Sequence, residues 1–156
     1  MSVIDEARAK IKGRGLTLVL PEGEDVRIRE AAERLARAGF AEPIVFGPEA
    51  PEPADRHVAL VMARRERMNE AMAQRLLRKP LYRAGAMVAT GEARAMLAGA
   101  AHPTARVIEA ALMTVGLAPG ISTPSSFFLM QWPARRLVFA DCAVNVQPTA
   151  EALADT

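Results

Sequence analysis

The chain has 156 residues, a length that fits one domain or one domain with the beginning of a second. Apolar residues make up 51% of it, enough for a buried core, while 20 basic and 18 acidic side chains give a net charge of only +2, which does not by itself indicate nucleic-acid binding. One cysteine excludes an internal disulfide, and no apolar run approaches the roughly 20 residues of a membrane helix, so we expect a cytoplasmic protein.

The first third of the sequence alternates helical and strand patterns. Residues 3–11 show helical spacing, and residues 16–20 form a short apolar run typical of a buried strand. Asp25 is expected to cap a helix that runs to about residue 38, and residues 44–46 read as a second strand. A strand, a helix and a strand in this order predict a parallel crossover.

The middle of the chain is mostly helical in pattern. Residues 58–65 are ambiguous between strand and helix, whereas residues 69–78 and 80–90 predict helices. Residues 94–98 favour a strand, which Arg94 restricts to an edge or an end of the sheet. A further helix is predicted from Thr104, with these residues on its apolar face: Val107, Ile108, Ala111, Leu112 and Val115.

Two apolar segments at residues 126–130 and 137–140 predict strands, and Thr149 is expected to cap a final helix of about two turns. We interpret so short a helix as the start of a longer element; the alternative is a short C-terminal helix docked on the sheet. The predicted fold is α/β: a three-layer α/β/α sandwich with a mainly parallel sheet. We expect an N-terminal α/β domain at residues 1–118 and the start of a second subdomain at 119–156.

Three blocks of the sequence carry a family resemblance: GAAHPTARVIEAAL from Gly99, PSSFF from Pro124, and FADCAVN from Phe139. Together with LVLPEGEDVR from Leu18, they resemble the phosphate acetyltransferase and phosphate butyryltransferase family. Members of that family are about twice as long as this chain, which resembles their N-terminal half. The resemblance therefore implies the N-terminal half of a two-domain fold.

The resemblance implies a phosphate acetyltransferase-like protein that transfers an acetyl or short acyl group between coenzyme A and inorganic phosphate to give acetyl phosphate. Coenzyme A and acetyl-CoA would be substrates, with no cofactor held tightly. The family's base is an aspartate in the C-terminal half, so no catalytic residue can be identified here and we expect weak or no activity from the chain alone. Expected partners are a second copy or a complementing C-terminal half. The alternative function is a noncatalytic acetyl-CoA-binding regulatory module.

The small-residue turn at 99–104 is the first candidate binding element. Backbone N–H groups before a helix favour an anion, and the Thr104 hydroxyl could reach a phosphate oxygen. His102 could cap the helix, form a hydrogen bond or contact a ligand. The alternative reading is an ordinary capped helix after a strand.

The family also uses two arginines to hold charged groups. Arg64 or Arg65 is the nearest match to the first of them. The second falls on Glu109, a carboxylate that would repel phosphate, so either Arg106 substitutes for it or Glu109 marks a subfamily. The basic segment 56–83 suits the rim of a coenzyme A site, although a solvated helix face or a nucleic-acid surface would show the same charges.

The ends of the last two apolar segments supply the remaining candidates. Ser125 or Ser126 could bind an acyl phosphate, and Asp141 and Asn145 follow the second segment. The alternative is that these serines and acidic or amide residues have a purely structural role. We reject Cys142 as a nucleophile, because a cysteine beside an apolar strand is usually an inert thiol. Two histidines and one cysteine show no metal-ligand spacing, so no metal is expected.

Overall fold

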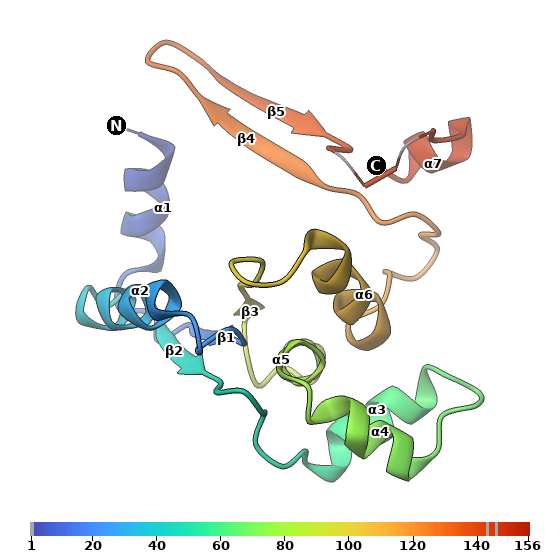
Figure 1. The fold of residues 1–156 in the computed structure, drawn as a ribbon. Helices are drawn as coiled ribbons and strands as arrows, with labels where there is room; N and C mark the ends of the chain where they lie inside the picture. The colour runs from blue at the N-terminus through green and yellow to red at the C-terminus, as the bar shows by residue number, and fades with distance from the viewer. Residues whose placement is uncertain (1, 143, 146) are drawn as a thin grey trace. The chain divides into compact units, whose positions relative to one another are not determined.

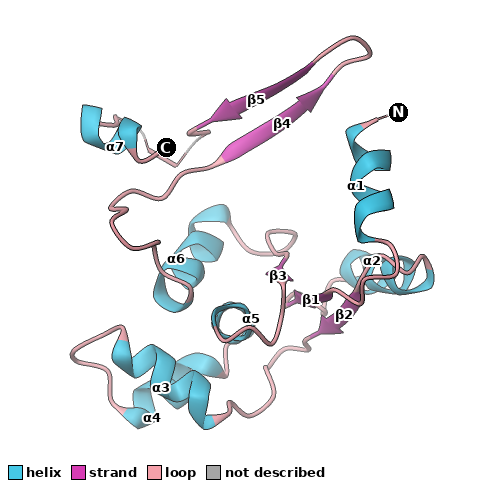
Figure 2. Ribbon diagram, turned by 180° about the vertical axis from the view of Figure 1, so that it is seen from behind, coloured by secondary structure: helices cyan, strands magenta, loops and turns pink. Residues whose placement is uncertain are grey.

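The computed structural model describes residues 2–142, 144, 145 and 147–156. The chain divides into two compact units, residues 8–116 and residues 1–7 with 117–156. The helices (Figures 1 and 2) are α1 Val3–Ile11, α2 Val26–Arg37, α3 Asp55–Ala63, α4 Glu70–Leu77, α5 Pro80–Ala89, α6 Thr104–Thr114 and α7 Ala150–Ala154. The strands are β1 Thr17–Leu20, β2 Glu42–Val45, β3 Ala95–Met96, β4 Phe127–Gln131 and β5 Arg136–Ala140. Within the described residues, no helix has the length and apolar character that crossing a membrane requires.

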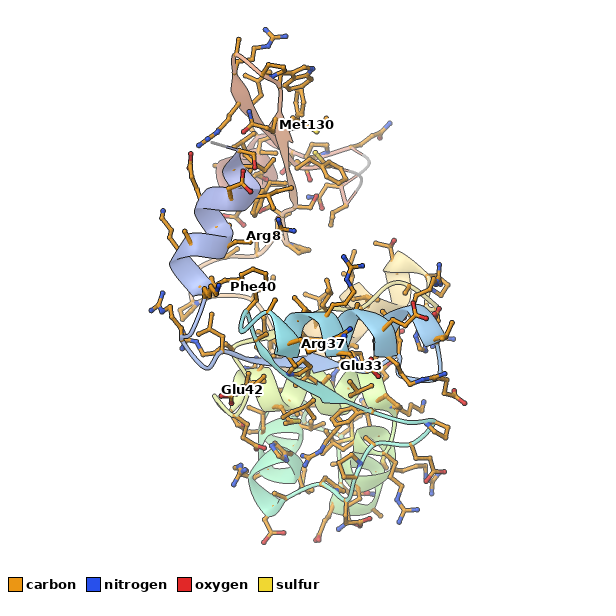
Figure 3. The ribbon with its side chains drawn as sticks, turned by 90° about the vertical axis from the view of Figure 1, so that its left-hand side faces the viewer. Arg8, Glu33, Arg37, Phe40, Glu42 and Met130 are labelled. Carbon is orange, nitrogen blue, oxygen red and sulfur yellow. The ribbon has the colours of Figure 1, made fainter. Side chains whose placement is uncertain are left out.

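A three-stranded parallel sheet forms the centre of the unit 8–116, in the order β2-β1-β3. Val19 and Leu20 are neighbours on β1, so their side chains point to opposite faces, and they are 0% and 1% exposed. Both faces of the sheet must therefore be covered. Figure 3 shows α2 on one side of the strands and α5 on the other. The predicted three-layer arrangement with a parallel sheet is thus confirmed.

Local signals explain where these elements begin and end. The Asp25 side chain accepts a hydrogen bond from the Arg27 N–H and caps α2, and Gly39 ends the helix at a φ of +68°. Residues 58–63 of the ambiguous segment belong to helix α3, and residues 64 and 65 follow its end. The strand expected at 94–98 is confirmed at the sheet edge but is only two residues long. Outside the sheet, the Arg8 guanidinium of α1 lies over the Phe40 ring, 5.8 Å from its centroid (Figure 3).

The buried side of α6 differs from the prediction. Leu112 and Val115, expected to face the core, are 40% and 38% exposed, whereas Ala110 and Thr114 are fully buried. The reason is a close approach between α5 and α6 at Gly85, where an added Cβ would overlap the Thr114 Oγ1. A contact between two helices at this distance requires small side chains. Val107 packs against the core as predicted, whereas Leu112 and Val115 do not.

An ionic cluster ties α3 to α5. His57 is 0% exposed, with its Nδ1 against the Arg83 guanidinium and its Nε2 against the Glu92 carboxylate, which also binds Arg56 at 2.6 Å. Burial lowers the pKa of Arg83, and the charge of Glu92 opposes that effect. His57 lies between the buried Arg83 cation and the Glu92 anion. The burial of these charged groups is therefore explained by their contacts within the fold.

Strands β4 and β5 form an antiparallel hairpin in the other unit, with Phe127 opposite Ala140 and Gln131 opposite Arg136 (Figure 1). The structure thus confirms both predicted strands. Every residue of both strands is exposed, including Phe127 at 70% and Val138 at 64%. Apolar side chains on both faces are typical of a strand that is covered on both sides, so this hairpin offers a large apolar surface.

We predict that Gly85→Ala destabilises the chain by about 1–3 kcal/mol, because the new methyl group forces α5 and α6 apart. Helix propensity alone predicts the opposite sign, a gain of up to about 1 kcal/mol. Urea unfolding measures the difference. Gly47→Ala is the matched control, since an added Cβ there meets nothing within 4 Å and the φ is not positive. Equal or higher stability of the Gly85 variant would contradict the close packing.

Candidate functional site

A buried glutamate organises the turn that precedes α6. Glu22 follows β1 in the turn Pro21–Gly23, and its side chain is 1% exposed. The carboxylate accepts hydrogen bonds from four consecutive backbone N–H groups: at Oε2 from Gly99 (2.9 Å) and Ala100 (2.8 Å), and at Oε1 from Ala101 (3.1 Å) and His102 (2.8 Å). The His102 Nδ1 also lies 2.8 Å from Oε1. The two sequence blocks PEGE and GAAH therefore form one structural element.

This geometry changes the role that the sequence suggests for the 99–104 turn. The turn does receive an anion, as its N–H groups predict, but that anion is supplied by the chain itself. Residues 99–102 thus have no backbone N–H left for a substrate phosphate. Thr104 is exposed at the first position of α6, where its N–H and hydroxyl lie outside the Glu22 network.

The ionisation of Glu22 follows from its surroundings. Burial by itself raises the pKa of a carboxyl group, but hydrogen bonds from the Ala100 N–H, the His102 side chain and the next two N–H groups outweigh it. The pKa of Glu22 falls from its ordinary 4.5 to about 2. Glu22 is therefore a carboxylate at neutral pH, and the surrounding N–H donors stabilise its negative charge.

A surface hollow of roughly 370 Å³ lies beside this turn. We call it the cationic hollow, and its lining residues are Lys79, Pro80, Leu81, Tyr82, His102 and Arg106. These residues belong to the first turns of α5 and α6 and to the residues just before them. Neither helix has a side-chain hydrogen bond at its N-cap, so the positive ends of two helix dipoles open here. Together with Lys79 and Arg106, they suit a phosphate-bearing ligand.

Glu109 lies next to the cationic hollow and interacts with two of its residues. Its Oε2 is 3.6 Å from Arg106 Nη1. The pKa of Tyr82 is raised by burial and then by the charge of Glu109 and a hydrogen bond to it, while Arg106 acts in the opposite sense. The carboxylate at the position where the resemblance expects an arginine thus offsets the charge of Arg106.

The other predicted arginines lie elsewhere. The Arg64 guanidinium lies beside Gly116, where an added Cβ would overlap its Nη1. Gly116 follows the C-terminal end of α6, and the 11 residues of this helix separate its two ends by about 15 Å. Arg64 is therefore not part of the cationic hollow. Arg65 is exposed in the turn after α3.

The serines and the acidic end of the last strand form a second group, in the other unit. The Ser126 hydroxyl donates to the Cys142 carbonyl at 2.7 Å. The Asn145 amide donates to Asp141 Oδ1 at 2.7 Å and to the Pro124 carbonyl at 3.1 Å. Asp141 has a φ of +50°, and Ser125 is exposed. These residues gather at one end of the hairpin; Ala143, in the same block, lies outside the described residues.

The sequence did not predict the role of Glu22, whereas Lys79 and Tyr82 lie within the basic segment 56–83 that was expected to suit the rim of a coenzyme A site. The signal for Glu22 was an acidic residue held in a turn directly after a buried strand. The glycine that follows Glu22 is part of this pattern. The turn requires a glycine at position 23, because an added Cβ there would overlap the Phe46 carbonyl oxygen. Across the described part of the chain, no group of three His, Cys, Asp or Glu side chains could hold a metal ion.

Known proteins are similar to this chain over almost its whole length. The family model described as phosphate acetyl/butaryl transferase matches residues 51–156. The phosphate acetyltransferase of Paracoccus denitrificans is 35% identical over 99% of this chain and 54% of its own length, and that of Staphylococcus aureus strain Mu50 is 29% identical over 98% and 54%. A phosphotransacetylase structure from Streptococcus pyogenes superposes with a TM-score of 0.86 at 33% identity, covering 99% of this chain and 56% of its own. The chain spans about half the length of the curated relatives it matches.

We predict that the Glu22 network produces a specific acid dependence of stability. Because the folded-state pKa is depressed from 4.5 to about 2, the network contributes fully above pH 4.5 and its contribution disappears as the pH falls towards 2. The loss amounts to roughly 3 kcal/mol. Urea unfolding between pH 2 and 7 should show it in the native chain.

In the same measurement, Glu22→Gln is the test variant and Glu24→Gln is its control, since Glu24 is an exposed residue of the same turn. The Glu24 variant should follow the native curve, and the Glu22 variant should be less stable at pH 7 and lack this part of the acid dependence. Parallel curves for both variants would show that Glu22 does not stabilise the fold.

Proposed function

The chain belongs to the phosphate acetyl/butaryl transferase family, and on that premise we propose that it forms part of a site that transfers an acetyl or short acyl group between coenzyme A and inorganic phosphate. Coenzyme A enters this proposal as a substrate, and the proposed location is the cytoplasm. The observation that supports it is the cationic hollow, in which Lys79, Arg106 and two uncapped helix N-termini surround a space suited to phosphate groups.

The reaction requires a base for the coenzyme A thiol, because the free thiol is mostly protonated near neutral pH. By resemblance, that base belongs to the half of the family fold that this chain does not match. We therefore propose that the chain alone binds coenzyme A but turns it over weakly or not at all. The predicted residues at the end of the hairpin, Ser125, Ser126, Asp141 and Asn145, remain proposed substrate contacts.

A second function is favoured by Glu109. Its carboxylate lies 3.6 Å from Arg106 and removes part of the positive charge that a phosphate substrate would use. Weakened binding of inorganic phosphate, with coenzyme A still held through Lys79, would suit a noncatalytic acetyl-CoA-binding regulatory module. The two functions differ in turnover, not in coenzyme binding.

The exposed surface of the β4–β5 hairpin is typical of a surface that binds a protein partner. Its strands are apolar on both faces, and the relatives contain nearly half their length beyond the matched part. We propose that a complementing C-terminal half of the family fold covers the hairpin. Association of two copies of this chain through the same surface is the alternative.

We predict that coenzyme A binds to the chain in isothermal titration and that Lys79→Gln weakens it about ten-fold, the change expected for one lost charge–phosphate contact. Arg67→Gln is the control, because Arg67 is also an exposed cation but does not line the cationic hollow. Glu109→Gln should tighten binding severalfold by releasing Arg106. Equal effects of the Lys79 and Arg67 variants would contradict this location for the site.

We predict that acetyl phosphate forms only when the chain is mixed with the C-terminal half of the Paracoccus denitrificans phosphate acetyltransferase. Val138→Lys should abolish complementation, because it places a charge on the apolar hairpin, while Met72→Lys, an exposed site on α4, should not. Full activity of the chain alone would contradict the need for a partner. Binding of acetyl-CoA without turnover in the mixture would favour the regulatory function.

A further inference from the structure

His102 occupies an unusual position between the buried Glu22 network and the cationic hollow. Its ring lines the hollow and its side chain is 43% exposed. Its Nδ1 lies 2.8 Å from Glu22 Oε1, and its backbone N–H donates to the same oxygen at 2.8 Å. The carboxylate thus holds both the main chain and the ring of one residue.

This contact fixes the protonation pattern of the ring. A carboxylate oxygen that already accepts N–H groups can only accept again, so the Nδ1 must carry the proton. In the neutral imidazole, Nε2 then has a free lone pair. Within the described residues Nε2 has no hydrogen-bond partner, so it is the ring atom with polar capacity left for a ligand.

We infer that Glu22 is a positioning residue that holds His102 as the Nδ1–H tautomer and presents Nε2 to the cationic hollow as a hydrogen-bond acceptor. This inference rests on the proposed function for the identity of the ligand. The hollow would then offer two kinds of group to a ligand: cations that bind phosphate groups, and the hydrogen-bond acceptor His102 Nε2. Nε2 favours a ligand that carries a hydrogen-bond donor as well as phosphate. Coenzyme A has such donors in the amide N–H groups and the thiol of its pantetheine arm.

The arrangement resembles the way a carboxylate orients a histidine in many catalytic sites, although the carboxylate here has a second task. It also closes the 99–102 turn through four N–H groups, so the fold itself holds the oxygen that His102 Nδ1 contacts. The acceptor that orients the ring is therefore in place before any ligand binds. Such preorganisation lowers the entropy cost of binding.

The direct test is nitrogen-15 NMR of the His102 ring in the free, native chain at a pH where the ring is neutral. We expect the Nδ1–H form to exceed the Nε2–H form by at least about ten-fold, because a hydrogen bond to a charged group favours it by that factor. A dominant Nε2–H form, or an even mixture, overturns the inference. This measurement needs neither activity nor ligand, so it decides the inference even if the chain does not bind coenzyme A.

Two substitutions separate positioning from stability. In His102→Asn the amide can still donate to Glu22 but the acceptor at the Nε2 position is lost, so we expect near-native unfolding and about ten-fold weaker coenzyme A binding. In His102→Gln the group reaches the Nε2 position but loses the link to Glu22, so we expect lower stability with a smaller loss of affinity. Unchanged affinity in the Asn variant overturns the inference. Absence of coenzyme A binding by the native chain would instead overturn the proposed function.

Discussion

The contact between the Glu22 carboxylate and four consecutive N–H groups of the 99–102 turn determines how the rest of this region is built. It connects the end of the central strand β1 to the entrance of α6, which are far apart in the sequence. A buried carboxylate is costly unless donors surround it, and an array of N–H groups without an anion is equally costly. Each group satisfies the other, so the pairing specifies a single arrangement of the turn.

This pairing has a chemical consequence for the surface beside it. Because the N–H groups of residues 99–102 already bind Glu22, the positive groups that line the hollow are Lys79, Arg106 and the first turns of α5 and α6. Glu109 moderates that attraction, since it interacts with both Arg106 and Tyr82. The cationic hollow is thus positive but not strongly so.

Much of the fold could be predicted from the sequence because its signals are local. The cap at Asp25, the positive φ of Gly39 and the short apolar run at β1 each depend on neighbouring residues only. The failures involve contacts between distant segments. The buried face of α6 depends on how closely Gly85 approaches Thr114, and the anion in the 99–102 turn comes from residue 22. No periodicity within one element contains that information.

Family resemblance gave the candidate residues but not their grouping. His102 and Arg106 share a hollow with Lys79 and Tyr82, Arg64 lies at the far end of α6, and Ser126 and Asn145 belong to a separate hairpin end. Hydrogen exchange of the backbone amides tests the central contact most directly. The amides of Gly99, Ala100, Ala101 and His102 should exchange slowly and together, like those of a secondary-structure element. Exchange at the rate of an open loop would show that Glu22 does not hold the turn.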